Sequence, residues 1–417
     1  MRRGWFWIPS LYFAEGLPYV IVMTLSVILY KRLGVSNTDI ALFTSWLYFP
    51  WVIKPLWSPF VDLIKTKRWW VCAMQLLIGG GMAGVAFTLP GDWFLQSTLA
   101  FFWLMAFSSA THDIAADGFY MLGQEEDDQA FFIGIRNTCY RIAMLTGQGV
   151  LVMLVGFLEK TTGRIPFAWS LIFLILSGVF IGLALWHRFI LPKPKNDKQH
   201  QGVTPRTICN EFIRTFEAFF HKKGIGLAIL FMLTYRLGES QLVKLASPFL
   251  LDDRATGGLG MSTTEVGFAY GTVGVFALLL GGLLGGFALA HGGLRKWIWP
   301  MALAISLPNL VYLYLAYQQP TTIWIINSCV AIEQFGYGFG FTAYTMYLML
   351  FAEGEYKTSH YAINTGFMAL GMMLPGMCSG WIQEQIGYQH FFIWVMLCCL
   401  PLFMILPFLK IEPTSKE

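Results

Sequence analysis

Charged residues are scarce in this sequence. Asp, Glu, Lys and Arg make up 12% of the 417 residues, which is about half of what an ordinary soluble domain carries. The mean hydropathy is +0.57. This combination excludes a soluble globular enzyme and a disordered protein. The net charge of +4 is small for such a length and provides no basic surface for nucleic acid.

Metal-ligand spacings and phosphate-binding loops are also lacking. The seven cysteines show no Cys-x-x-Cys pair and no Cys/His ligand spacing, so we predict no disulfide, no metal and no cofactor. His112, Asp113 and Asp117 come nearest to a ligand set, but no second His or Cys accompanies them. The absence of a Walker-type loop argues against transport driven by ATP.

The sequence contains instead twelve apolar runs, each long enough to cross a bilayer as a helix of about 20 residues. These runs fall at about residues 5–30, 40–60, 69–89, 94–121, 131–158, 167–189, 225–251, 265–290, 297–317, 323–351, 361–385 and 391–409. The first run is too long for a signal peptide, so we expect it to be retained. We therefore predict an all-α integral membrane protein with twelve transmembrane helices in a lipid bilayer.

Lysine and arginine are distributed unevenly between the two sides that these helices define. Of the 28 residues, eighteen lie on the side of the N-terminus or in the central loop, and five lie on the other side. Cytoplasmic loops are enriched in Lys and Arg, so both termini are predicted to be cytoplasmic, in the inner membrane of the cell. The remaining five cations lie inside the apolar runs: Lys54, Arg136, Arg141, Arg236 and Lys244.

One long polar stretch, residues 191–224, divides the chain into two six-helix halves, residues 1–190 and 225–417. Within this linker, Thr204 and Pro205 form a helix-start signal, and phenylalanines recur after it at helical spacing. This pattern predicts an amphipathic helix on the cytoplasmic membrane surface.

Short segments recur between the two halves at an offset of about one half-chain. Residues 33–40 resemble 259–266, residues 67–69 resemble 295–297, and residues 137–138 resemble 364–365. Such a parallel repeat is typical of two pseudo-symmetric halves related by an axis along the membrane normal.

Four motifs, together with this repeat, carry a resemblance to a known family. The motifs are Phe-Ala-Glu-Gly-Leu-Pro at 13–18, Lys-Pro-Leu-Trp-Ser-Pro-Phe-Val-Asp at 54–62, Ser-Ser-Ala-Thr-His-Asp-Ile-Ala-Ala-Asp-Gly at 108–118, and Tyr-Arg-Leu-Gly-Glu at 235–239. They resemble the peptide–acetyl-CoA transporter branch of the major facilitator superfamily, and within it the AmpG-type muropeptide permeases. The resemblance implies the major facilitator fold and a symporter in which helices 1, 4, 7 and 10 line a central cavity.

Ionisable residues inside the apolar runs are candidates for the transport site, because a charge in hydrocarbon costs roughly 2.5–3.5 kcal/mol. With a rise of about 1.5 Å per residue, Glu15, Arg236 and Glu333 lie near the membrane midplane. The cavity that the resemblance implies makes seven residues the candidates for substrate binding: Tyr12, Glu15, Tyr235, Arg236, Glu239, Glu333 and Tyr337.

Two roles remain open for Arg236. It either holds an anionic group of the substrate or is simply neutralised by Glu239, three residues further along the helix. Glu15 and Glu333 have no partner at helical spacing, and a carboxyl in apolar surroundings favours its protonated form. These two residues, with Asp113, are therefore the candidates for proton coupling.

The remaining intramembrane charges suggest ion pairs. Helices 4 and 5 are predicted to form a hairpin that places Asp117 at the depth of Arg136, and Asp113 at the depth of Arg141. We expect these four residues to form structural or gating ion pairs near the cytoplasmic side. Asp62, at the end of helix 2, resembles the superfamily's cytoplasmic loop motif, and this resemblance implies a gating role.

These observations favour a secondary active transporter, a proton-coupled importer of a peptidoglycan-derived muropeptide, acting as a monomer on a small-molecule substrate. A siderophore or an acyl-CoA-like metabolite is the alternative cargo within the same branch. The alternative of another class is a polytopic membrane enzyme. Its only candidate catalytic cluster, the acidic stretch at residues 125–128, is typical of a solvated loop, so we expect no enzyme activity.

The predicted topology can be tested by cysteine labelling from outside whole cells. A cysteine at position 160 should react with a membrane-impermeant reagent, because Lys160 is predicted to be periplasmic. Cysteines at positions 68 and 198 should be protected, because Arg68 and the central loop are predicted to be cytoplasmic. External labelling at position 198 would overturn the orientation.

Overall fold

The structure is a computed structural model that describes residues 3–123, 126–194, 197, 205–409 and 411, without the side chains of 3, 62–63, 126–131, 133, 205, 207–208 and 211. Helices are the only regular secondary structure in this described part. Every run that the sequence predicts as a helix is mostly helical, although turn residues interrupt the second run at Leu47 and Tyr48 and the seventh at Tyr235 and Arg236. The chain divides into two compact units.

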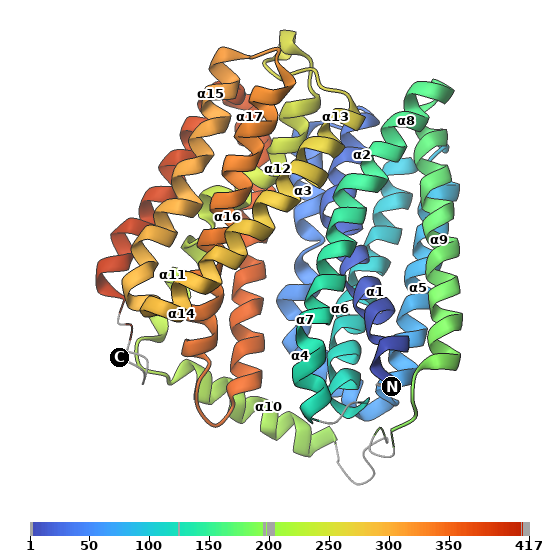
Figure 1. The fold of residues 1–417 in the computed structure, drawn as a ribbon, viewed down its shortest axis with the longest axis vertical. Coiled ribbons are helices and arrows are strands. Elements are labelled where there is room, and N and C mark those ends of the chain that lie inside the picture. The colour runs from blue at the N-terminus through green and yellow to red at the C-terminus, as the bar shows by residue number, and fades with distance from the viewer. Residues whose placement is uncertain (1–2, 124–125, 195–196, 198–204, 410, 412–417) are drawn as a thin grey trace. The chain divides into compact units, whose positions relative to one another are not determined.

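Unit 1 comprises Met1–Leu33 and Ile53–Cys209. Its helices run side by side as a bundle (Figure 1). They are the 3-10 helix η1 (Arg3–Phe6), α1 (Ile8–Val20), the π-helix η2 (Ile21–Leu25), α2 (Ser26–Arg32), most of α4 (Phe49–Ile64), α5 (Lys67–Thr88), α6 (Phe94–Gly123), α7 (Glu126–Leu145), the π-helix η3 (Thr146–Leu151), α8 (Val152–Thr162) and α9 (Ile165–Ile190).

Unit 2 comprises Gly34–Val52 and Asn210–Glu417, so it includes a short segment of the predicted first half. Its helices are α3 (Asn37–Trp46), most of α10 (Pro205–Phe220), α11 (Ile225–Thr234), α12 (Leu237–Leu251), η4 (Arg254–Thr256), α13 (Thr263–Gly267), the π-helix η5 (Phe268–Gly274), α14 (Val275–Ser306), η6 (Leu307–Asn309), α15 (Leu310–Gln318), α16 (Ile323–Phe351), α17 (Lys357–Ile405) and η7 (Leu406–Phe408).

Seven helices in the described part of the chain are long and apolar enough to cross a membrane. Two of them, Thr263–Gln318 and Lys357–Phe408, contain 56 and 52 residues, more than twice the ~20 residues that one crossing needs. Each of these two bends at a glycine with a positive φ, Gly293 (64°) and Gly387 (77°). These glycines lie between successive predicted crossings. The full count of twelve crossings and the cytoplasmic position of the termini remain predictions.

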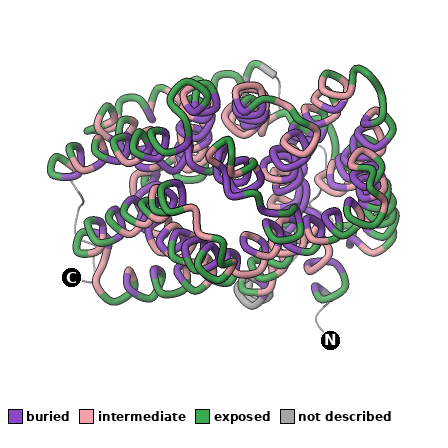
Figure 2. The backbone as a smooth tube through the Cα atoms, turned by 90° about the horizontal axis from the view of Figure 1, so that it is seen from above, coloured by how far each residue is buried: buried purple, intermediate pink, exposed green. Residues whose placement is uncertain are grey.

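The outward faces of the helices are apolar. Figure 2 shows buried residues facing the helix neighbours within each unit and exposed residues facing away from them. Many of the exposed side chains are large and hydrophobic; Phe87 is 74% exposed and Phe189 is 81% exposed. Exposed large apolar side chains in such number suit lipid rather than water.

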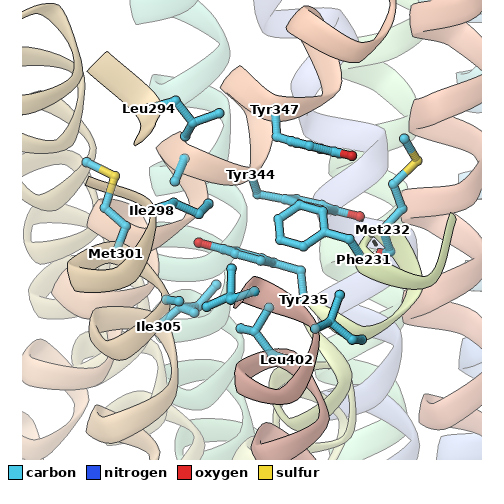
Figure 3. Close-up of a cluster of buried hydrophobic side chains, with 14 of the residues drawn as sticks. Phe231, Met232, Tyr235, Leu294, Ile298, Met301, Ile305, Tyr344, Tyr347 and Leu402 are labelled. Atoms are coloured by element: carbon cyan, nitrogen blue, oxygen red, sulfur yellow. Dashed lines mark hydrogen bonds between the residues drawn. The ribbon is translucent and has the colours of Figure 1, made fainter. Parts of the chain in front are cut away.

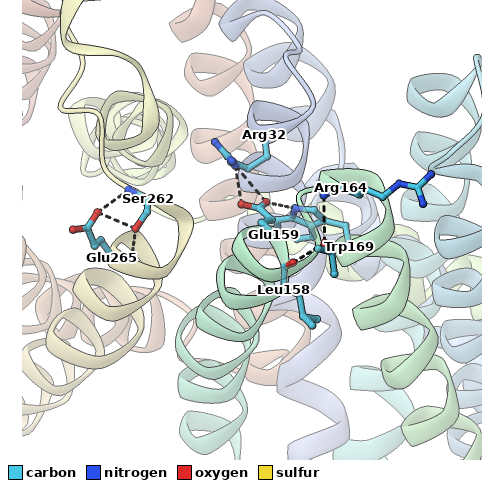
Figure 4. Close-up of polar contacts among 8 residues, drawn as sticks. Arg32, Leu158, Glu159, Arg164, Trp169, Ser262 and Glu265 are labelled. Atoms are coloured by element: carbon cyan, nitrogen blue, oxygen red, sulfur yellow. Dashed lines mark hydrogen bonds and ion pairs between the residues drawn. The ribbon is translucent and has the colours of Figure 1, made fainter.

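The first of the recurring sequence pairs starts a helix in the same way in both copies. Ser36 Oγ accepts a hydrogen bond from Asp39 N at 3.1 Å before α3, and Ser262 Oγ accepts one from Glu265 N at 3.3 Å before α13. The Glu265 carboxylate accepts the Ser262 N–H in return, which completes a capping box (Figure 4). This shared cap supports an internal duplication.

A buried carboxylate joins three helices of unit 1. Glu159 of α8 is 8% exposed. It accepts hydrogen bonds from Arg32 Nε of α2 at 3.1 Å and from Trp169 Nε1 of α9 at 2.9 Å (Figure 4). Because its charge is paired and hydrogen-bonded, Glu159 links the ends of α2, α8 and α9.

Stacked tyrosines fix the core of unit 2 (Figure 3). The rings of Tyr235 and Tyr344 lie 4.8 Å apart and nearly parallel. Their hydroxyls donate to backbone carbonyls, Tyr235 to Gly340 O at 2.7 Å and Tyr344 to Met232 O at 2.6 Å. Buried tyrosine hydroxyls need such partners, so these bonds hold α11 against α16 at one position.

The predicted amphipathic helix is α10, which begins at Pro205. Its Phe219 ring stacks on Phe367 at 6.2 Å. Just after the helix, Lys222 Nζ donates to Phe351 O at 2.6 Å and to Glu353 O at 2.8 Å. These bonds satisfy carbonyls at the end of α16 and attach α10 to unit 2. The location of α10 on the membrane surface remains a prediction.

Helices α14 and α16 approach each other at glycines. A Cβ on Gly281 would overlap the carbonyl oxygen of Phe335, and a Cβ on Gly338 would overlap that of Leu278. Small residues of this kind allow membrane helices to pack backbone to backbone. Gly286, on an exposed face of α14, has no atom within 4 Å of the same position.

These two environments predict opposite effects of one added methyl group in the same helix. Gly281→Ala should destabilise the purified protein by about 1–3 kcal/mol, because the Cβ strains the contact between the two helices. Gly286→Ala should be neutral or stabilising by up to about 1 kcal/mol, because alanine is the better helix former. Thermal unfolding in detergent measures both. Equal shifts for the two variants would contradict the packing.

Candidate functional site

The candidate site in unit 1 centres on Glu15 of α1. Gly16 brings this part of α1 close to α7, since a Cβ there would lie 3.0 Å from the carbonyl oxygen of Tyr140. The Glu15 side chain is consequently 9% exposed. Its Oε2 atom is buried and has no hydrogen-bond partner in the described part of the chain. An ionised carboxylate in this position would lack the hydrogen bonds that normally stabilise it.

Two ion pairs lie within electrostatic range of Glu15. Lys54 Nζ of α4 is 3.6 Å from Asp113 Oδ2 of α6, and Arg136 Nη2 of α7 is 3.0 Å from Asp117 Oδ1 of α6. Each pair is neutral as a whole. Glu15 is therefore the acidic group left over in this cluster, and its protonation makes the cluster neutral.

Aromatic rings hold the Arg136 guanidinium in place. Its central carbon lies 4.5 Å from the ring centre of Tyr12 and 5.1 Å from that of Tyr120, distances at which a cation is attracted to an aromatic face. The Tyr12 hydroxyl donates to Asp117 Oδ1 at 3.1 Å. The Tyr12 ring is 1% exposed, so in this structure it supports the ion pair and offers no free face to a substrate.

The structure brings Asp117 and Arg136 together but does not join Asp113 to Arg141. Asp113 faces Lys54 instead, and Arg141 is exposed. The predicted hairpin matched residues by depth alone. Arg141 lies five residues beyond Arg136, which at 3.6 residues per turn places it on a different face of α7. The side chain of Asp62 lies outside the described residues.

Lys54 is the member of this cluster to which sequence reasoning gave no partner. The sequence does indicate that Lys54 needs an acidic partner, because it is a cation inside the apolar run of helix 2. It does not indicate which face of α6 packs against α4, and therefore which acid is the partner. Pairing between helices that are distant in the sequence depends on this tertiary arrangement, which spacing does not reveal.

The candidate site in unit 2 centres on Arg236, which interrupts the seventh predicted crossing. Its backbone, with φ −112° and ψ 20°, separates α11 from α12. Arg236 Nε donates to Glu239 Oε2 at 2.6 Å, and Nη2 donates to Glu239 Oε1 at 3.1 Å and to the Tyr337 hydroxyl at 3.0 Å. The pair that the sequence spacing suggests is thus formed, with the bidentate geometry typical of Arg and carboxylate.

One edge of the Arg236 guanidinium remains available. The group lies 5.2 Å from the ring centre of Tyr337 and 5.1 Å from that of Phe341. Its Nη1 atom makes no hydrogen bond in the described part of the chain, although it carries two N–H donors. The side chain is 11% exposed. Pairing with Glu239 therefore leaves donors that an anionic ligand can use.

The two tyrosines predicted beside Arg236 differ in their surroundings. Tyr235 is 3% exposed and its ring is stacked in the core of unit 2 (Figure 3), so it offers no stacking surface. Tyr337 is half-buried and bonds Arg236 directly. Only Tyr337 is therefore placed to meet a ligand at the Arg236 edge.

Glu333 of α16 is the second buried acid of unit 2. It is 5% exposed, and its Oε2 accepts a hydrogen bond from Gln334 Nε2 at 2.8 Å. The hydroxyls of Tyr270 and Tyr312, which bond each other, lie within electrostatic range of it. Unlike Glu15, this carboxylate has a donor that stabilises its charged form.

Comparisons with known proteins agree with the helical fold. The family model described as Major Facilitator Superfamily matches residues 10–374. The chain is 25% identical over 406 residues to the putative transporter AmpG 4 of Rickettsia conorii, covering 95% of this chain and 94% of that protein. It is 25% identical over 398 residues to the anhydromuropeptide permease of Escherichia coli, covering 93% and 76%.

The fold has a close counterpart among solved structures. The crystal structure of the nucleoside transporter NupG superposes with a TM-score of 0.72 and covers 99% of this chain and 100% of that chain. The sequence identity is 16%, so this likeness concerns the fold alone.

Proposed function

Since this chain is a transporter that belongs to the Major Facilitator Superfamily, we propose that it imports a peptidoglycan-derived muropeptide across the inner membrane, as a monomer, together with protons. Support for the cargo comes from the similarity to an anhydromuropeptide permease over 93% of the chain. The observation that carries the coupling is Glu15, a buried carboxyl with an unpartnered oxygen beside two neutral ion pairs.

The cargo chemistry fits the donors of unit 2. A muropeptide joins a sugar to a short peptide that carries carboxylates. Arg236 keeps the two N–H donors of Nη1 unpaired while Glu239 and Tyr337 hold the rest of the guanidinium. A side chain fixed in this way loses little freedom when it binds a carboxylate. Tyr337, beside it, supplies an aromatic ring and a hydroxyl for the neighbouring part of the cargo.

The coupling proton is assigned to Glu15 in preference to Glu333 or Asp113. Asp113 is paired with Lys54, and Glu333 accepts a hydrogen bond from Gln334. Glu15 has neither kind of partner for its Oε2 atom. When the site is open to the periplasm, Glu15 takes up a proton, and the neutral carboxyl tolerates the closed, dry state. When the site opens to the cytoplasm, water stabilises the charged form and the proton leaves.

Arg236→Lys tests the anion site. Lysine keeps the charge but loses the planar fork, so the KM for muropeptide uptake should rise by about tenfold, which corresponds to ~1.4 kcal/mol, while the protein still folds. Uptake into proteoliposomes gives the KM. If the double variant Arg236→Ala/Glu239→Ala transports as the wild type does, the pair is purely structural and the anion site is wrong.

Glu15→Gln tests the coupling. Glutamine keeps the size and hydrogen-bonding groups but cannot cycle a proton, so accumulation driven by a pH gradient should be lost while exchange of bound cargo continues. Glu333→Gln is the matched control in the other unit and should still accumulate cargo. The measurement is uptake and counterflow in proteoliposomes with and without the gradient. Gradient-driven accumulation by the Glu15→Gln protein would contradict the assignment.

A further inference from the structure

A second cation is buried in unit 2 without an acidic partner. Lys244 of α12 is 2% exposed, and no ion pair within the described part of the chain includes it. Its Nζ donates to Thr44 Oγ1 of α3 at 3.1 Å. The Thr44 hydroxyl donates to Ile40 O at 2.6 Å, so its oxygen is free to accept. One of the three ammonium N–H groups is thereby satisfied.

An aromatic ring covers part of the ammonium group. Lys244 Nζ lies 5.0 Å from the centre of the Tyr48 ring, close enough for a cation–π contact. A single hydroxyl and a single ring are poor replacements for the water that a buried ammonium loses. Replacement of Lys244 by an apolar residue would remove this cost, so stability alone does not account for the lysine.

A neighbouring polar group is also unsatisfied. Ser45 Oγ is buried and has no hydrogen-bond partner in the described part of the chain. A Cβ placed on Gly376 of α17 would lie 2.6 Å from Ser45 Oγ and 3.5 Å from Lys244 Cγ. Both side chains therefore flank the same glycine, where α3 and α12 meet α17.

Lys244 lies on α12, and Arg236 immediately precedes the first residue of that helix. They are eight residues apart, which is about 12 Å along α12 at 1.5 Å per residue. Tyr48 contacts Lys244 and also lies within electrostatic range of Arg236. An extended peptide rises about 3.3–3.6 Å per residue, so three or four residues span the distance between the two cations.

We propose that Lys244, with Thr44, Ser45 and Tyr48, forms a second anion-binding site that takes a carboxylate of the peptide part of the cargo; this rests on the proposed function. A carboxylate matches the single positive charge, and it accepts hydrogen bonds from the ammonium group and from Ser45. Thr44 holds the ammonium group in the absence of cargo. Arg236 and Lys244 together then select a short peptide with two separated negative charges.

The test compares two muropeptides that differ only at the end of the peptide, one with a free terminal carboxylate and one with a terminal amide. In proteoliposomes, the wild type should take up the acid with a KM about tenfold lower than the amide. Lys244→Gln should raise the KM for the acid by about tenfold and leave that of the amide within about twofold, and Lys244→Arg should retain the preference. Lys223→Gln removes the same charge at an exposed position of unit 2 and should change neither value.

The outcomes separate the two claims. If the wild type takes up neither muropeptide, the proposed function is wrong, and the second anion-binding site, which rests on it, is wrong too. If the wild type takes up both with the same KM, or if Lys244→Gln changes both KM values equally, the second anion site alone is wrong. The wild-type comparison holds even if Lys244→Gln does not fold, which thermal unfolding in detergent would reveal.

Discussion

The pairing of charges inside apolar helices is the constraint on which the rest of this structure depends. A lone charge in a low-dielectric environment is expensive, and a partner with good geometry offsets much of that cost. Unit 1 meets the constraint with Lys54–Asp113 and Arg136–Asp117, and unit 2 meets it with Arg236–Glu239. Aromatic rings then fix both arginines. Against these ion pairs, Glu15 and Lys244 stand out as charged groups that no ion pair in the described part of the chain includes.

The unpaired groups account for the chemistry that we assign to the transporter. In unit 1, Glu15 is an acid that no ion pair among the described residues includes, so proton exchange is the least costly way to keep the cluster neutral. In unit 2, Lys244 is a cation that no ion pair in the described part of the chain includes, and the Nη1 atom of Arg236 has no hydrogen-bond partner in that part. An anionic cargo can satisfy both. In this account, the proton neutralises Glu15, and the anionic cargo pairs with Arg236 and Lys244.

The sequence predicted the helical architecture well, because apolar runs of spanning length, bounded by polar residues, leave few alternatives. It also predicted that Glu15, Arg236 and Glu333 lie near the membrane midplane, and this depth stays a prediction. It did not predict which faces meet. Arg141 was matched to Asp113 by depth, yet Lys54 is the partner, and Tyr235 and Tyr12 proved to be buried supports. Lys244 lies on α12, and its environment depends on the packing of α12 against α3 and α17. Both of these helices are far from α12 in the sequence.

Linkage between cargo binding and the protonation of Glu15 is the central claim, and proton uptake by the purified protein measures it directly. Muropeptide is added to protein in weakly buffered detergent solution containing a pH indicator, over a series of pH values. If the sites are linked, cargo binding draws in up to about one proton per wild-type molecule. The Glu15→Gln protein draws in none, and the Glu333→Gln protein behaves as the wild type. Cargo binding without proton uptake at any pH, or equal uptake by the Glu15→Gln protein, would contradict the account.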